Sequence, residues 1–124
     1  MIIFAKDIEL FKDFSEFEQY DFHNNYKCCR VAFSNNSIEL IFENYIDKSV
    51  VNLVFNDAIL KKVDFNFLKI IDIGNLSTID NIYRGRFEKN GDLLEFSDEG
   101  KSYWYLETVE GLHLEFFCGS IELN

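Results

Sequence analysis

The sequence predicts a mainly β protein of the α+β kind: an antiparallel sheet, a sandwich or a small barrel of successive hairpins, with one short N-terminal helix. Three observations predict it. Apolar residues alternate with period two from residue 27 onward, turn-forming pairs separate the alternating runs, and helical spacing occurs only near the N-terminus. With 124 residues, no proline and no Gly/Ser-rich stretch, the chain is expected to form a single domain, residues 1–124.

The expected helix lies in the segment AKDIELFKDFSEFEQYDF, residues 5–22. Ile8, Phe11 and Phe14 recur at three-residue steps with acidic residues between them. Asp7 stands near the N-terminal end, where a carboxylate interacts favourably with the helix dipole. The alternation in FSEFEQYDF is also compatible with a strand.

A first hairpin is predicted in KCCRVAFSNNSIELIFE, because Asn-rich pairs favour tight turns. A two-residue turn at Asn35-Asn36 places six residues on one face, in three facing pairs: Phe33 with Ile38, Val31 with Leu40, and Cys29 with Phe42. A second hairpin is predicted around Asn56-Asp57, with four aliphatic residues available to one face: Val50, Val54, Ile59 and Val63.

The segment FLKIIDIG, residues 67–74, is expected to form a further strand or a short irregular stretch, and LSTIDNIYRG a loop leading into a strand near Ile82. Asn90-Gly91 then carries the strongest short-range hairpin signal in the chain. Pairing outward from this turn places Phe87 opposite Leu94 and Arg86 opposite Glu95. An opposite-charge pair across two strands supports that register by about 0.2–1 kcal/mol.

The last hairpin is predicted in SYWYLETVEGLHLEFF, residues 102–117, with Glu110-Gly111 as a two-residue turn. This turn assigns seven residues to the core face: Tyr103, Tyr105, Val109, Leu112, Leu114, Phe116 and Cys118. It assigns a mixed set to the opposite face: Trp104, Leu106, Thr108, His113, Glu115 and Phe117.

The charge balance excludes several classes of partner. Twenty-two Asp and Glu against twelve Lys and Arg give a net charge of −10, which disfavours nucleic acid and anionic membranes and favours a basic protein. Acidity also serves solubility alone. Cys28, Cys29 and Cys118 have no metal-binding spacing, so no metal, cofactor or disulfide is expected, and the compartment is taken to be the reducing cytoplasm.

The mixed face of the last hairpin carries the most functional-looking residues. Aromatic side chains anchor protein interfaces, and acidic ones attract basic partners. His113 and Glu115, two apart on a strand, point the same way and have the chemistry of a proton-transfer pair, but no catalytic motif surrounds them. No catalytic residue is therefore assigned, and the predicted partner-binding residues are Trp104, Glu107, Glu110, His113 and Glu115.

The stretch YWYLETVEGLHLEFF, residues 103–117, resembles the C-terminal end of small acidic bacterial proteins that include immunity proteins of polymorphic and contact-dependent toxin systems. The resemblance implies a compact, cytoplasmic, non-enzymatic protein that binds and blocks a cognate toxin. Two other functions remain open, a small β-barrel that binds an apolar ligand and a small hydrolase. Self-association through an edge strand, giving a homo-oligomer, is also open.

Overall fold

The computed structural model describes most of the β-rich part of the chain: residues 2–4, 20–65, 78–87, 93–94, 97–98, 100–109 and 111–124. The expected helix near residues 7–17 and the segment 67–74 lie outside these residues. Within them the chain is mainly β and contains no helix, so none is present that is long and apolar enough to cross a membrane.

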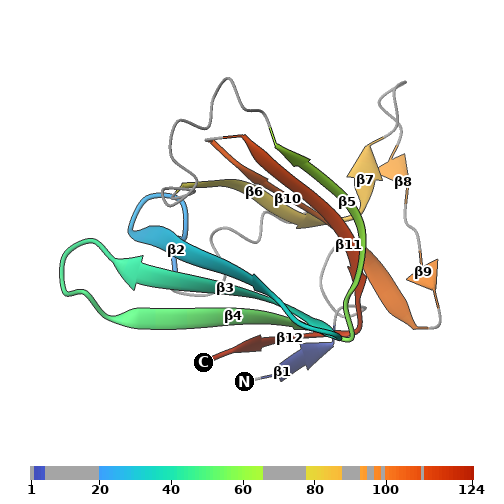
Figure 1. The fold of residues 1–124 in the computed structure, drawn as a ribbon, viewed down its shortest axis with the longest axis horizontal. Coiled ribbons are helices and arrows are strands. Elements are labelled where there is room, and N and C mark those ends of the chain that lie inside the picture. The colour runs from blue at the N-terminus through green and yellow to red at the C-terminus, as the bar shows by residue number, and fades with distance from the viewer. Residues whose placement is uncertain are drawn as a thin grey trace.

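Two antiparallel sheets form the architecture (Figure 1). Sheet A has the order β1 (Ile2–Phe4), β12 (Ser120–Leu123), β4 (Val50–Asn56), β3 (Ser37–Asn44) and β2 (Tyr26–Phe33). Sheet B has the order β5 (Ile59–Phe65), β11 (Leu112–Cys118), β10 (Lys101–Thr108) and β6 (Ile79–Arg84), with β9 (Ser97–Asp98) also paired to β10. The predicted antiparallel β class is confirmed, as two packed sheets; the closed-barrel alternative is wrong.

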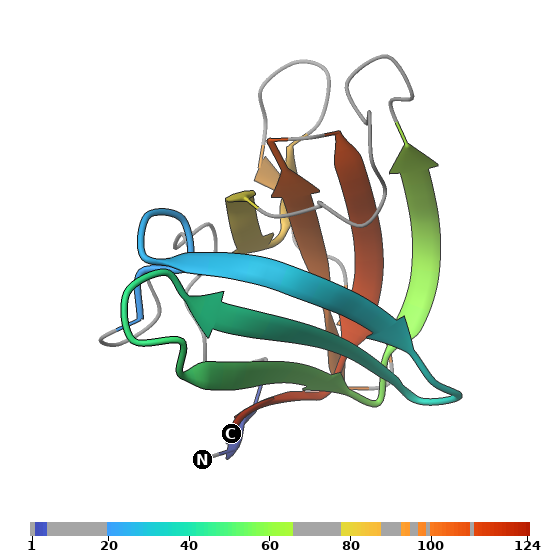
Figure 2. The same ribbon diagram turned by 60° about the vertical axis from the view of Figure 1, so that its left-hand side comes forward.

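The two sheets pass into each other through one shared bend. β4 continues into β5 at Asp57, and β11 continues into β12 at Gly119 (Figure 2). The pairing register is the same on both sides, since Phe117 faces Ile59 before the bend and Ser120 faces Asn56 after it. Strands that turn a corner in this way join sheets packed at a steep angle.

This bend replaces the hairpin predicted at Asn56-Asp57. Asp57 does adopt a left-handed conformation, with a φ of 53°, as expected of a turn-forming residue. The chain then moves to the second sheet instead of folding back, because β4 pairs with β3 and β12 while β5 pairs with β11. The predicted pairing of β4 with β5 is wrong.

The core lies between the sheets. Fully buried Phe55 of sheet A contacts Trp104 and Phe116 of sheet B, with ring centroids 5.8 and 4.8 Å apart. At another point Phe22 stacks on Phe42 at 4.3 Å. Burying large apolar side chains contributes about 1.5–3 kcal/mol each, so these aromatic contacts are a main source of stability.

The first hairpin is confirmed in its turn and in two of its three pairs. Phe33 faces Ile38 and Val31 faces Leu40, but Cys28 rather than Cys29 faces Phe42. A β-bulge between Cys28 and Arg30 inserts one extra residue and shifts the register. As a result Cys28 is buried and Cys29 is exposed.

The last hairpin forms where predicted but with a three-residue loop, 109–111, in place of the two-residue turn. Gly111 has a φ of 110°, which a residue with a side chain rarely adopts. One extra loop residue reverses the faces of β10, so Trp104 and Leu106 point into the core while Tyr103 and Tyr105 point outward. The inward set predicted for β11 is correct.

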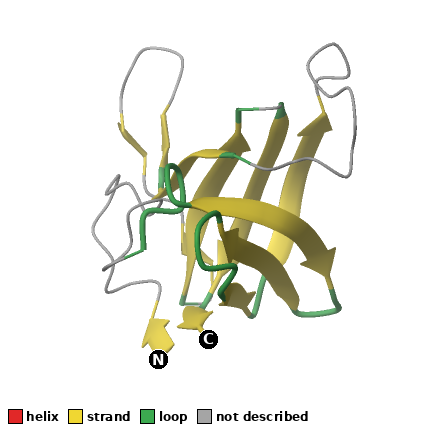
Figure 3. Ribbon diagram, turned by 90° about the vertical axis from the view of Figure 1, so that its left-hand side faces the viewer, coloured by secondary structure: helices red, strands yellow, loops and turns green. Residues whose placement is uncertain are grey.

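Around Asn90-Gly91 two short strands do pair, β7 (Arg86–Phe87) and β8 (Leu93–Leu94), shown in yellow with the other strands in Figure 3. Their register differs by one residue from the prediction, since Phe87 faces Leu93 and Arg86 faces Leu94. The predicted pair of Arg86 with Glu95 is therefore wrong. The turn itself lies outside the described residues.

The bend is expected to be sensitive to side-chain bulk at Gly119. A Cβ there would lie 3.2 Å from Asp57 Oδ2 and 3.4 Å from Asp57 Cβ. Gly119→Val is expected to lower the free energy of unfolding by about 1–3 kcal/mol in urea titrations, because the added atoms crowd the bend. Ser120→Val, the same bulk one residue later, is the control. Adding Asp57→Gly to Gly119→Val is expected to restore part of the loss; a Gly119→Val variant as stable as the control would contradict this account.

Candidate functional site

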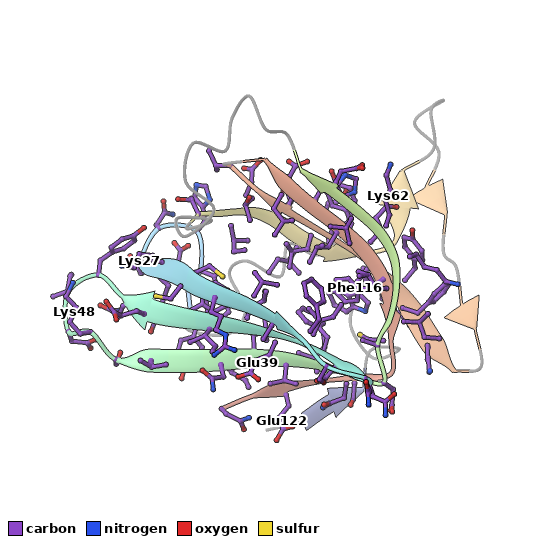
Figure 4. All side chains as sticks on the ribbon, in the orientation of Figure 1. Lys27, Glu39, Lys48, Lys62, Phe116 and Glu122 are labelled. Carbon is purple, nitrogen blue, oxygen red and sulfur yellow. The ribbon has the colours of Figure 1, made fainter. Side chains whose placement is uncertain are left out.

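The outward face of sheet B gathers polar and aromatic side chains from four strands. Figure 4 shows Phe116 between the two sheets and Lys62 on the opposite side of sheet B. We call the residues of this outward face the outer patch: Lys62 and Asp64 of β5, His113, Glu115 and Phe117 of β11, Tyr103, Tyr105 and Glu107 of β10, and Tyr83 of β6.

Glu115 is the centre of the outer patch and is only 2% exposed. The Tyr103 hydroxyl donates a hydrogen bond of 2.8 Å to its Oε1. Its Oε2 lies 3.0 Å from His113 Nε2 and 4.0 Å from Lys62 Nζ. The contact with His113 has the distance of an ion pair but lacks the alignment of a hydrogen bond. A buried carboxylate is costly without such partners, so this group holds β5, β10 and β11 together.

His113 lies between two carboxylates. Besides Glu115, it has Asp64 Oδ2 3.9 Å from its Nδ1, and Asp64 in turn lies 3.3 Å from Lys62 Nζ. Lys62 and Asp64 are about half exposed, whereas His113 is more buried. The charged groups of β5 therefore form the solvent-facing margin of the outer patch.

Stacked aromatic rings form the other side of the outer patch. The rings of Tyr83 and Tyr105 lie 4.8 Å apart with an interplanar angle of 14°, and the His113 ring lies 4.5 Å from Tyr105. The Tyr105 hydroxyl donates a 2.6 Å hydrogen bond to Glu107 Oε2. That bond, opposed by burial, holds the pKa of Glu107 below its ordinary value. Burial, followed by the charges of Glu107 and Glu115, raises the pKa of Tyr83 to about 12.

The five predicted partner-binding residues have different positions. Glu107, His113 and Glu115 meet in the outer patch. Trp104 does not: it is 0% exposed and packs against Phe55 in the core, because the longer loop reverses the faces of β10. Its assignment to an exposed binding surface is therefore corrected. Glu110 lies outside the described residues.

Sequence reasoning missed five members of the outer patch: Tyr83, Tyr103, Tyr105, Lys62 and Asp64. Tyr103 and Tyr105 were assigned to the core, and the strand containing Lys62 and Asp64 was paired with the wrong neighbour. The opposite charges two residues apart in KKVD are the one sequence signal that places Lys62 and Asp64 together on a strand face.

The chemistry of the outer patch is that of carboxylates beside aromatic rings. Such a surface attracts the ammonium or guanidinium group of a basic side chain. Among the described residues, no three His, Cys, Asp or Glu side chains are arranged to hold a metal ion. Cys118 is buried, and burial raises the pKa of its thiol, which disfavours the reactive thiolate.

Comparisons of the chain with models of protein families, with curated proteins and with solved structures gave no match. A function must therefore be inferred from the residues of this chain and their geometry.

Glu115 is expected to contribute strongly to stability. Glu115→Ala removes the acceptor of the Tyr103 hydroxyl and the anion beside His113, which should lower the free energy of unfolding by roughly 1–3 kcal/mol. Glu115→Gln keeps an acceptor for Tyr103 and should lose less. Glu39→Ala, on the outer face of sheet A (Figure 4), is the control and is expected to change stability by less than about 0.5 kcal/mol. Equal losses for Glu115→Ala and Glu39→Ala in chemical denaturation would contradict this role.

Tyr83 and Tyr105 of the outer patch are expected to ionise late, because burial raises the pKa of both. The pKa of Tyr83 is about 12 in the folded protein and roughly 10 in an unfolded chain. Because the folded value is higher, this group stabilises the fold fully below pH ~10 and the contribution is lost as pH rises through the folded pKa. A base titration followed by tyrosinate absorbance should show late ionisation of both Tyr83 and Tyr105, and Tyr83→Phe should remove the Tyr83 step. Glu107→Gln should move the step to lower pH and Glu39→Gln should not; a step unmoved by Glu107→Gln would refute the electrostatic contribution.

Proposed function

We propose that this chain is a non-enzymatic, cytoplasmic protein-binding module, and more narrowly an immunity-type inhibitor that covers a basic surface of a toxin. One observation carries the proposal: Glu107 and the stacked rings of Tyr83 and Tyr105 lie together on the outward face of sheet B. The net charge of −10 supports it, because an acidic protein attracts a basic partner and speeds the encounter.

The electrostatics of the outer patch support a cationic ligand group. The charges of Glu107 and Glu115 both contribute to the raised pKa of Tyr83, which means that the local potential is negative. An arginine or lysine entering this potential can lie over the ring of Tyr83 or Tyr105 and interact with Glu107. Contacts of this kind contribute about 0.5–1 kcal/mol at exposed sites and about 2 kcal/mol or more when water is excluded.

The roles that we propose for individual residues differ from those expected from the sequence. Tyr83 and Tyr105, rather than Trp104, are the aromatic residues that a partner can reach. Glu115 is buried, so we assign it the role of holding His113 and Tyr103 in place and not that of a direct contact. The free thiols of Cys28, Cys29 and Cys118 are compatible with a reducing cytoplasm.

The proposal predicts a salt-sensitive, basic protein partner. The immobilised chain should retain a stoichiometric basic protein from the lysate of its natural host, released as salt is raised. With that protein purified, Glu107→Lys is expected to weaken binding about tenfold or more. Glu39→Lys, the same charge change on sheet A, should alter it by less than about twofold. Two variants with equal effects would place the binding surface elsewhere, and the absence of any salt-released partner would contradict the proposal.

A further inference from the structure

β5 is an edge strand with an unusual degree of exposure. Residues 59–64 are all exposed, although three of them are large and apolar: Ile59 at 36%, Leu60 at 41% and Val63 at 39%. On the opposite edge of sheet B, by contrast, Ile79 and Ile82 of β6 are fully buried. β5 forms the margin of sheet B in Figure 2, and no described strand pairs with its outer side.

The two faces of β5 are chemically distinct. Val63 faces Leu114 and Leu60 faces Phe116, so both lie on the inner face of the sheet. Lys62 and Asp64 lie on the outer face, opposite Glu115 and His113. A β-bulge at Lys61 accommodates the extra residue between Leu60 and Lys62.

We propose that β5 pairs antiparallel with β5 of a second copy of this chain, about a two-fold axis at Val63. In this register Val63 faces Val63 of the second copy on the inner face. Lys62 faces Asp64 of the second copy, and Asp64 faces its Lys62, on the outer face. The two copies of sheet B become one continuous sheet, and the interface is isologous, as in most homodimers.

Charge complementarity favours a second copy over another partner. Lysines on an edge strand usually oppose pairing. Here each Lys62 gains the Asp64 carboxylate of the second copy in addition to its own Asp64, 3.3 Å away, and Glu115, 4.0 Å away. The Lys62 and Asp64 side chains of the two copies then place four charges of alternating sign around the axis. A slip of one residue would place Lys62 opposite Val63 and mix the two faces. A slip of two would place Lys62 opposite Lys62 or Asp64 opposite Asp64, so the faces and the charges together select one register. The pairing also brings the exposed Val63 side chains of both copies together at the axis.

Sedimentation equilibrium of the full chain over a range of concentrations tests the proposal, with salt near the physiological level to screen the net charge. A monomer–dimer equilibrium is expected. Lys62→Asp alone and Asp64→Lys alone each place like charges opposite each other and should weaken dimerisation by about tenfold. The double variant restores opposite pairs and should dimerise within about threefold of the unchanged chain. A chain that stays monomeric throughout, or single variants that dimerise normally, would overturn the proposal.

Cross-linking fixes the register in a second measurement, which does not depend on Lys62 or Asp64. In a Cys29→Ser background, Val63→Cys places two cysteines with Cα atoms roughly 4.5–5.5 Å apart across the axis, within the range of a disulfide. The matched control is Asp64→Cys, whose two copies would lie about 7–8 Å apart on the diagonal. Covalent dimer on mild oxidation is expected for Val63→Cys and not for Asp64→Cys; equal yields, or none, would overturn the register.

A monomer that still binds a basic protein would refute the dimer and leave the proposed function standing, because the two inferences are independent.

Discussion

The shared bend at Asp57 and Gly119 is the constraint on which the rest of the structure depends. It converts two long paired strands into the junction of two sheets without changing their register. Side chains alternate between the two faces along a strand. Once the inward residues of β4 and β12 are set, the register at the bend therefore determines which residues of β5 and β11 point inward. Gly119 approaches Asp57 closely, which explains why residue 119 carries no side chain.

The outer patch follows from this register. With Phe116 directed into the core, its neighbours Glu115 and Phe117 must point outward, and Glu115 meets Lys62 across the ladder. The bulge at Lys61 adds twist near this point, where edge strands commonly deviate from regular pairing. The buried carboxylate of Glu115 is therefore a consequence of strand pairing, and its contacts with Tyr103, His113 and Lys62 offset the cost of burial.

The parts of this fold that depend on apolar alternation were predictable, and those that depend on counting loop residues were not. Alternation correctly placed the inward residues of β11, and the Asn35-Asn36 turn correctly set two pairs of the first hairpin. A single extra residue, at the bulge near Cys29 or in the loop before Leu112, reverses a strand face. Sequence composition rarely reveals such an insertion, since Glu-Gly is compatible with loops of two or three residues. Trp104 moved from the expected surface to the core for this reason alone.

The same reasoning distinguishes two of the edge strands of the described sheets, β2 of sheet A and β5 of sheet B. Each strand contains a bulge and two cations, Lys27 and Arg30 on β2 and Lys61 and Lys62 on β5, which are the usual protections against unwanted pairing. The sequence of β2, YKCCRVAF, contains no acid, so two β2 edges repel each other in any register. β5, ILKKVDF, contains one acid two residues from a lysine on the same face. The β2 edge is therefore protected against pairing with itself, whereas the β5 edge is complementary to itself in a single register.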